Sequence, residues 1–246
     1  MSRRHIGNGY YVIHNNCITR FDSVQEIFKK YYRTIDFPTF TVITSLDRPT
    51  ITYFKDKNHV YVDSFMNEFT ILEDANPDDF NILDLEKGFS NSGNQDYVYD
   101  RKLPYLLKDV VKLSSYYQKV NDKIYFGYTH LVEEVDVDSF KIVHPDMNFA
   151  RDKDFFYFKD KRVPEIDIST FKFLDACFTD EYYQNQDVCW YAVDSKNAYF
   201  VNSIADKIKV IKTKNPSNFG FEIVDEIGYG VDGDIRYYYG KRIRRK

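Results

Sequence analysis

Cysteine and glycine are scarce in this chain of 246 residues. The 10 glycines are too few to make all of its turns, so side-chain chemistry must do part of that work. The three cysteines, Cys17, Cys177 and Cys189, form no C-x-x-C pair. Such an odd, unclustered set excludes a disulfide framework and is typical of reduced residues in a cytosolic protein.

Long apolar runs are missing as well. No stretch of about 18 apolar residues is present to span a bilayer as a helix. Arg3-Arg4 is followed by His5-Ile6-Gly7 and not by the apolar stretch that an export signal requires. The formal net charge of −4 argues against a basic groove for nucleic acid. We therefore expect a cytoplasmic protein that binds no membrane, and nucleic acid is an unfavoured partner.

Aromatic residues are abundant. They make up 18% of the chain, with 22 Tyr and 21 Phe, far more than catalysis could use. Cross-strand pairing and a sheet core explain such a number best. A chain of this length can bury roughly 70 to 75% of its unfolded surface, and no Pro/Gly/Ser-rich linker divides it. These observations predict a single all-β body over residues 1–246.

A short phrase recurs, in which Asp or Asn is followed four positions later by Phe and then by another large apolar residue. Its copies are Asp36…Phe40, Asn76…Phe80, Asp136…Phe140, Asp167…Phe171 and Asn215…Phe219. The acid or amide is the residue type that caps a helical turn. We expect one such turn in each copy, with the Phe pointing inward as an anchor.

Each phrase is linked to a hairpin whose polar turn is flanked by aromatic and β-branched residues. The clearest copy runs from Tyr53 to Tyr61 around Asp56-Lys57. Aligned copies place hairpin turns near positions 14, 56, 100, 122, 152, 194 and 232. The shortest step, from 100 to 122, is also where the Phe phrase is missing. Tandem β-hairpin repeats, arranged as an irregular propeller or a short solenoid, are the predicted fold.

Two segments depart from the strand pattern. A capping-box pattern at Asp22-Ser23-x-x-Glu26, followed by apolar residues at helical spacing, predicts a short amphipathic helix over residues 23–32. The apolar residues between 104 and 117 fit either a helix face or the strand that the repeat requires.

The hairpin strings resemble those of a known family. They read Asp56-Lys57-Asn58-His59-Val60-Tyr61 and Asp194-Ser195-Lys196-Asn197-Ala198-Tyr199, and each is linked to a D-x-x-x-F phrase. This pattern resembles the DKNYY repeat family over positions 10 to 240. The resemblance implies a bacterial protein, often encoded near secreted or contact-delivered toxins. It brings no assigned activity and no catalytic residues.

Catalytic motifs are incomplete. The stretch from Gly228 to Gly233 matches G-x-G-x-x-G, but a strand pattern follows it, so we expect the turn of the last hairpin. The segment 88–93 is one residue away from a nucleophile elbow and is expected to be a loop. His130 and Glu133 come closest to a metal-ligand pair, and two ligands are weak evidence. We expect no catalytic residue, no cofactor and no metal.

Charge patterning points to a partner. The stretch from 63 to 86 contains no Lys or Arg and eight acids, which are Asp63, Glu68, Glu73, Asp74, Asp78, Asp79, Asp84 and Glu86. It is either a solvated face that protects an edge strand or a patch that steers a basic partner. The basic tail at 241–246 has the opposite sign. It is compatible with a disordered terminus, a partner for the acidic stretch or a nucleic-acid contact.

Our leading hypothesis is a cytosolic protein-binding repeat protein, an immunity protein that binds and neutralises a bacterial polymorphic toxin. It rests on the family context, the acidic stretch suited to a basic toxin domain, and the lack of an assembled catalytic set. The alternatives are an enzyme, such as a hydrolase of unrecognised type, and a structural or scaffold module. The oligomeric state is left open.

Overall fold

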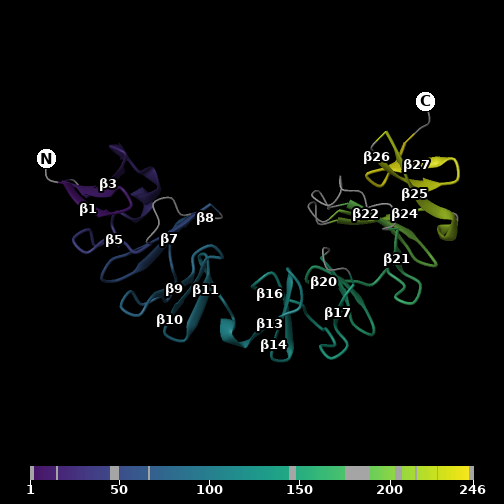
Figure 1. Cartoon of the computed structure of the whole chain (residues 1–246), viewed down its shortest axis with the longest axis horizontal. Helices are drawn as coiled ribbons and strands as arrows, with labels where there is room; N and C mark the ends of the chain where they lie inside the picture. The colour runs from purple at the N-terminus through teal and green to yellow at the C-terminus, as the bar shows by residue number, and fades with distance from the viewer. Residues whose placement is uncertain are drawn as a thin grey trace. The chain divides into compact units, whose positions relative to one another are not determined.

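The computed structural model describes residues 3–14, 16–44, 50–65, 67–143, 148–174, 189–202, 207–213, 215–225 and 227–243, with the backbone alone at Asn67 and Cys189. In these residues the chain forms seven four-stranded antiparallel sheets, one after another along the sequence. Figure 1 shows them in chain order from purple to yellow. The prediction of an all-β chain of tandem hairpin repeats is therefore confirmed.

The chain divides into two compact units, Met1–Val110 and Val111–Lys246. Unit 1 holds the first three sheets. The first sheet consists of β1 (Arg3–Gly7), β2 (Tyr10–Ile13), β3 (Cys17–Arg20) and β4 (Ser23–Val24); the second of β5 (Thr41–Val42), β6 (Ile51–Lys55), β7 (Val60–Ser64) and β8 (Asn67–Ile71); the third of β9 (Asn81–Asp84), β10 (Phe89–Ser92), β11 (Gln95–Val98) and β12 (Arg101–Lys102).

Unit 2 holds the remaining four sheets, and β13 begins at its boundary. The fourth sheet consists of β13 (Val110–Lys112), β14 (Tyr117–Val120), β15 (Lys123–Phe126) and β16 (His130–Leu131); the fifth of β17 (Lys141–Ile142), β18 (Phe149–Arg151), β19 (Phe156–Phe158) and β20 (Lys161–Val163); the sixth of β21 (Lys172–Phe173), β22 (Cys189–Val193), β23 (Ala198–Asn202) and β24 (Lys207–Ile211); the seventh of β25 (Phe219–Val224), β26 (Ile227–Asp232), β27 (Ile235–Tyr238) and β28 (Lys241–Ile243). The same four-stranded sheet thus recurs in both units.

Within every sheet the strands lie side by side in chain order, and neighbouring strands are antiparallel. The central turn, between the second and third strands, carries the polar pair seen in the sequence, as at Asp56, Asp152 and Asp194. The phrases lie in the links between sheets, and each ends directly before the first strand of the next sheet or, at Phe219, on its first residue.

The turn predicted near position 100 has a different place in its sheet. Tyr99 and Asp100 connect β11 to β12, which are the third and fourth strands. The central turn of the third sheet follows Ser92, which pairs with Gln95. The step of 22 residues was therefore an error of alignment. The segment 88–93, expected to be a loop, contains strand β10, because its alternate polar residues Ser90 and Ser92 are buried in the sheet.

The helix expected over 23–32 is shorter and of another type. Ser23 and Val24 form β4 and pair with β3, so their backbone is not free to start a helix. The 3₁₀-helix η1 then runs over Glu26–Tyr31 without a side-chain cap. Glu26 pairs with Lys29 at 2.5 Å instead of closing a capping box.

Between 104 and 117 the strand alternative is correct. The chain there forms one 3₁₀-turn, η2 (Leu107–Asp109), followed by β13. This turn lies in the link where the Phe phrase is missing, and the Leu107 N–H donates to the carboxylate of Asp96 on β11 at 2.6 Å.

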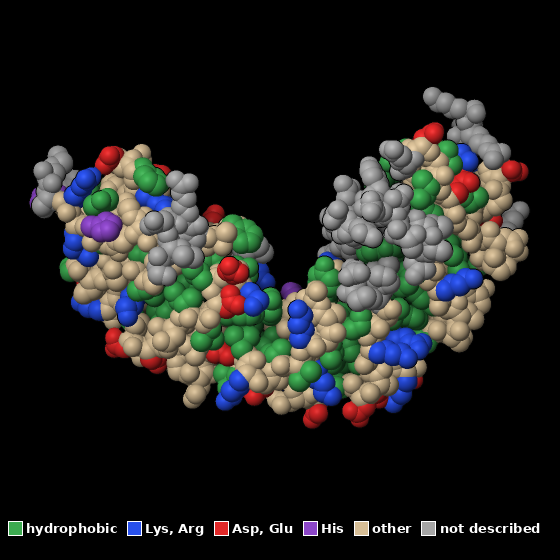
Figure 2. All heavy atoms as spheres, viewed as in Figure 1, with side chains coloured by type: hydrophobic (Ala, Val, Ile, Leu, Met, Phe, Trp, Pro, Cys, Tyr) green, Lys and Arg blue, Asp and Glu red, His purple; other side chains and the backbone are tan. Residues whose placement is uncertain are grey.

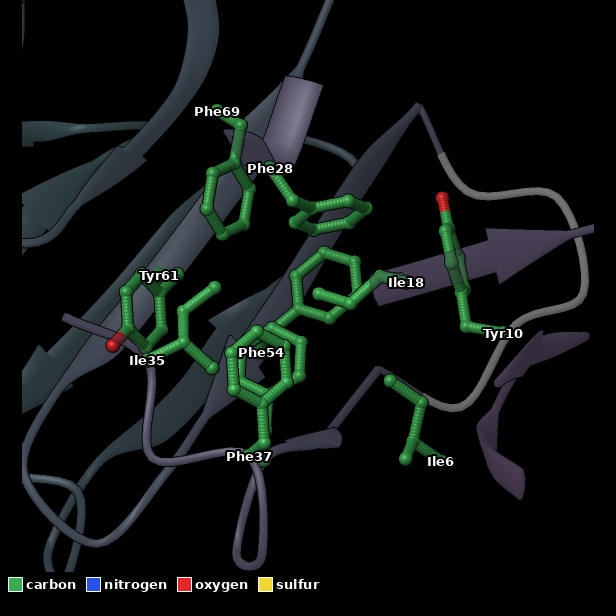
Figure 3. Close-up of a cluster of buried hydrophobic side chains, with 10 residues drawn as sticks. Ile6, Tyr10, Ile18, Phe28, Ile35, Phe37, Phe54, Tyr61 and Phe69 are labelled. Atoms are coloured by element: carbon green, nitrogen blue, oxygen red, sulfur yellow. The ribbon is translucent and has the colours of Figure 1, made fainter. Parts of the chain in front are cut away.

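The hydrophobic core lies between consecutive sheets of each unit. Figure 3 shows the cluster joining the first two sheets, where Phe28, Phe54 and Phe69 point toward one another. The rings of Phe28 and Phe69 are 4.5 Å apart and meet edge to face, the arrangement that aromatic pairs prefer. Four further clusters join the second sheet to the third, the fourth to the fifth, the fifth to the sixth and the sixth to the seventh. Each sheet therefore depends on a neighbour for its burial.

Buried tyrosines also link consecutive sheets by hydrogen bonds. The Tyr53 hydroxyl of the second sheet donates to the Gly88 carbonyl of the third at 3.1 Å. Tyr117 of the fourth sheet donates to the Lys159 carbonyl of the fifth at 2.7 Å. Because these hydroxyls are satisfied, the rings can be buried without an unpaired polar atom.

Candidate functional site

The recurring turn aspartate is a buried hydrogen-bond acceptor. In the second sheet, Asp56 is 3% exposed. Its Oδ1 accepts the backbone N–H groups of Asn58 at 2.7 Å and His59 at 2.8 Å. Its Oδ2 accepts the Asp36 N–H at 2.8 Å and the Tyr61 hydroxyl at 2.7 Å. One carboxylate therefore closes the hairpin turn, holds the link between sheets and fixes a core tyrosine.

The same four hydrogen bonds recur at Asp152 and Asp194. The tyrosine five residues later donates to Oδ2 at 2.7 and 2.5 Å, respectively. The first residue of the preceding phrase donates its N–H to the same oxygen at 3.0 and 2.9 Å. This network explains why the hairpin string carries an Asp and, five residues on, a Tyr.

Electrostatics agree with this structural role. Burial opposes ionisation of Asp152, but the Asp136 N–H and the Tyr157 hydroxyl outweigh it, so the pKa of Asp152 is lowered. Burial and the Asp152 carboxylate raise the pKa of Tyr157 to about 12. The pKa of Asp194 is lowered in the same way, although its burial acts to raise it. These carboxylates stay ionised and fully engaged, so they serve the fold and are not free to act as acids or bases.

Asp136 acts as the expected cap of its phrase. Asp136 accepts the Ser139 N–H at 3.0 Å and the Ser139 hydroxyl at 2.7 Å, and it pairs with Lys153 at 2.6 Å. Lys153 and Ser139 together lower the pKa of Asp136 to about 2. Asp138, two residues on, is exposed.

The phenylalanines of the phrases point into the core to different depths. Phe40 and Phe219 are buried. Phe80, Phe140 and Phe171 are half-buried and pack against core clusters. All five therefore contact the core, and three of them reach less deeply than an anchor role implies.

The acidic stretch lies on the second and third sheets. Although it contains no Lys or Arg, lysines from outside the stretch pair with two of its acids. Asp74 pairs with Lys102 and Asp84 with Lys87, each at 2.6 Å. Asp79 accepts the hydroxyl of Ser92, the residue that replaces Asp at the third sheet's central turn. Asp74, Asp79 and Asp84 thus already have partners within the chain.

The remaining acids of the stretch differ in exposure. Asp63 is half-buried and its pKa is raised by burial, against the nearby Arg20 charge. Glu68, Glu73, Asp78 and Glu86 are exposed. No ion pair is recorded for these four within the part of the chain that the structure describes. They are the part of the predicted partner-binding set that is available to a partner.

A second surface feature, which the sequence analysis missed, lies at the turns between third and fourth strands in unit 1. These turns carry Phe21, Phe65 and Tyr99. The side chains of Phe21 and Phe65 are 78% and 71% exposed. Phe65 meets Tyr99 edge to face with ring centroids 6.2 Å apart. We call Phe21, Phe65 and Tyr99, with Arg20 and Asp63, the third-turn edge. In Figure 2 hydrophobic and acidic side chains mix on the surface of this unit.

Two residues of the third-turn edge have a costly backbone conformation. Phe21 has φ +50° and Tyr99 has φ +54°, in the left-handed region that bulky residues rarely adopt. An exposed Phe at such a turn gains little from burial, so its presence favours a role outside the fold. Arg20 lies over the Tyr10 ring at 4.6 Å and the Phe21 ring at 5.1 Å. These rings therefore already hold one guanidinium.

Comparison with known proteins agrees with the geometry of the turns. A family model described as the DKNYY family matches residues 25–161 and 116–245. The chain belongs to the DKNYY family. No curated protein and no solved structure matches it.

In this DKNYY chain the other predicted features are placed as follows. The G-x-G-x-x-G string, predicted as the turn of the last hairpin, lies mostly in a strand: Gly228 to Asp232 belong to β26, and only Gly233 is in the turn. His130 lies on β16 and, like Glu133, is exposed. Lys241–Ile243 of the basic tail forms β28, while residues 244–246 and Cys177 lie outside the described residues.

Two features are absent from the residues that the structure describes. No group of three or more His, Cys, Asp or Glu is placed there to hold a metal ion. Among the same residues, no helix has the length and apolar character needed to cross a membrane.

Proposed function

We propose that this DKNYY-family chain is an immunity protein, which binds a bacterial polymorphic toxin through unit 1 and neutralises it. The observation that carries the proposal is the third-turn edge, where Phe21 and Phe65 are exposed to solvent. The expectation that such proteins are encoded near toxins supplies the biological context. The chain would act in the cytoplasm, where the toxin must be blocked.

A protein partner suits the chemistry of this edge. Aromatic residues and Arg are enriched in the cores of protein–protein interfaces and dominate their hot spots. The third-turn edge supplies two exposed phenylalanines, a tyrosine and Arg20 on adjacent sheets. A partner that covered Phe65 would bury apolar surface that the free chain leaves in water.

A basic partner suits the charges around it. Each third turn of unit 1 places a carboxylate within two residues of its aromatic side chain, at Asp22, Asp63 and Asp100. The exposed acids Glu68, Glu73, Asp78 and Glu86 lie on the same unit. Lys and Arg side chains of a basic toxin domain could contact these rings and carboxylates, and the outlying acids would accelerate encounter.

The proposal is tested by purifying the chain from its native host and identifying the proteins that accompany it in stoichiometric amounts. The expected partner is a basic toxin domain whose activity is lost in the complex. Phe65→Ala should weaken binding by at least about tenfold, as for a typical hot spot. Ile223→Ala is the matched control, because Ile223 is an exposed apolar residue of unit 2. A partner that retains its activity when bound, or equal binding by both variants, would contradict the proposal.

A further inference from the structure

Unit 2 contains a surface hollow of about 560 Å³ formed by the fifth and sixth sheets and the link between them. Its apolar lining includes Phe156, which is buried, and Phe171 and Phe173, which are half-buried. Its charged lining is Lys141 from β17, Arg151 from β18 and Lys172 from β21. Lys141 and Lys172 are exposed, so the hollow reaches the surface. Figure 2 shows Lys and Arg side chains beside hydrophobic ones on this unit.

Three cations of the hollow have no recorded counter-ion. No acid is among the described residues that line it. Within the same described residues, no side-chain hydrogen bond or ion pair is recorded for Lys141, Arg151 or Lys172. The nearest acid in the link, Asp167, is engaged with the hydroxyls of Ser169 and Ser195 at 2.6 and 2.9 Å. Within the described residues, the hollow therefore combines an apolar floor with three cations that have no recorded anionic partner.

Two of these cations oppose each other in the sheet. Lys141 is the direct cross-strand partner of Arg151 in the β17–β18 pairing. Like charges placed directly opposite destabilise a sheet. The second sheet avoids this cost at the corresponding pair, Thr41 and Lys55. There Thr41 is neutral, and Lys55 donates to the Pro77 carbonyl of the next link at 2.8 Å.

We propose that this hollow binds an acidic segment of a protein partner, with an apolar side chain on the phenylalanine floor and carboxylates on Lys141, Arg151 and Lys172. The like-charge pair is then explained by the anion that it receives. This inference concerns unit 2 and is independent of the interface assigned to unit 1.

A protein segment fits the floor better than single-stranded nucleic acid does. Base stacking requires open aromatic faces. The Phe171 ring is stacked on Phe149 with an interplanar angle of 12°, and it meets Phe173 edge to face at 85°. Since the rings pack on one another, the floor offers apolar edges suited to a side chain.

The experiment measures binding of a fluorescein-labelled peptide in which Phe alternates with Glu, by fluorescence anisotropy at physiological salt. The wild-type chain should bind it, and Lys141→Glu and Arg151→Glu should each weaken binding by at least about tenfold. Lys207→Glu is the matched control on β24, the opposite edge of the sixth sheet, and should bind as the wild type does. Lys141→Glu should also raise Tm by about 2 °C, because an opposite-charge pair replaces a like-charge pair. A variant that is more stable and binds less tightly cannot have lost binding by misfolding.

Four results would overturn the inference. They are no binding of the Glu-Phe peptide, equal binding of a Glu-Ala peptide that lacks the apolar side chains, equal or tighter binding of oligothymidylate, and unchanged binding by the charge-reversed variants. The first result would contradict an acidic segment as the ligand, the second would contradict the role of the apolar floor, and the third would contradict a protein as the partner. The fourth would place the peptide elsewhere on the chain.

Discussion

The Tyr157 hydroxyl donates to the buried Asp152 carboxylate at 2.7 Å, from five residues further along the chain. The ring of Tyr157 is fully buried, and its hydroxyl has a charged acceptor in the turn. The same pair recurs as Asp56 with Tyr61 and as Asp194 with Tyr199. Each of these three hairpins thus connects its turn to the core through one carboxylate.

The first prediction concerns this carboxylate. Asp152→Ala should lower the free energy of unfolding by about 3 kcal/mol or more, because three N–H groups and the Tyr157 hydroxyl lose their acceptor. Asp154→Ala is the control, since Asp154 is an exposed residue of the same turn. It should change stability by less than about 0.5 kcal/mol. Urea denaturation of both variants measures the difference, and equal stability would mean that the network contributes little.

Stability should fall in acid. The pKa values of Asp152 and Asp194 are lowered in the folded chain, and those of Asp136 and Asp167 are lowered to about 2. A carboxyl group with a lowered folded pKa contributes stability above its unfolded value of about 3.9 and loses it as the pH falls through the folded pKa. Tm should therefore be steady down to about pH 4 and decline toward pH 2. Asp167→Asn should flatten part of that decline, and an unchanged acid profile would contradict the assignment.

A glycine tests how the sheets of unit 2 pack. A Cβ on Gly230 would lie 2.6 Å from the Phe219 ring and 2.6 Å from the ring of Tyr191, which belongs to the neighbouring sheet. Gly230→Ala should therefore destabilise the chain by about 1–3 kcal/mol. Gly220→Ala, on the paired strand, meets nothing within 4 Å and should be neutral or slightly stabilising. Thermal unfolding compares the two, and a neutral Gly230→Ala would show that the sheets pack less closely.

The fold could be predicted from the sequence where one residue type performs each task. Asp at the central turn and Phe in the link recur because a carboxylate accepts several N–H groups and a ring fills the space between sheets. The third sheet was misaligned because Ser92 takes the place of Asp, and its hydroxyl bonds to the Asn76 N–H at 2.8 Å. The prediction of a helix over residues 23–32 is wrong because the pairing of Ser23 and Val24 in the sheet outweighs a local capping pattern.

The candidate site was less accessible to sequence reasoning. The acidic stretch was evident, but Lys87 and Lys102, which neutralise part of it, lie outside the stretch. Exposed Phe21 and Phe65 resemble core residues in a chain so rich in aromatics. The strand positions must be known before an aromatic residue in the turn between third and fourth strands can be distinguished from one in a buried strand. The sequence signal, in retrospect, is an aromatic residue directly before an acid, as in Phe21-Asp22 and Tyr99-Asp100.

The exposed acids should control the rate of association. A variant with Glu68→Lys, Asp78→Lys and Glu86→Lys should fold normally, because these side chains are exposed. Its association with the toxin should slow, and the salt dependence of the on-rate should weaken, since exposed charges act through steering over about 8–10 Å. Reversal of Glu133, Asp138 and Asp154, three exposed acids of unit 2, is the control. Stopped-flow measurements at several salt concentrations compare the two triple variants. Equal effects on the association rate would mean that the acids act only through the net charge of the chain.

The most direct test of the proposed function is protection of cells that express the co-purified toxin. A chain carrying Phe21→Ala and Phe65→Ala should accumulate to normal levels, because both side chains are exposed, and should fail to protect. The control, with Val210→Ala and Ile223→Ala, removes two exposed apolar side chains of unit 2 and should protect fully. Full protection by the Phe21→Ala, Phe65→Ala chain would contradict the assignment of the third-turn edge as the surface that neutralises the toxin.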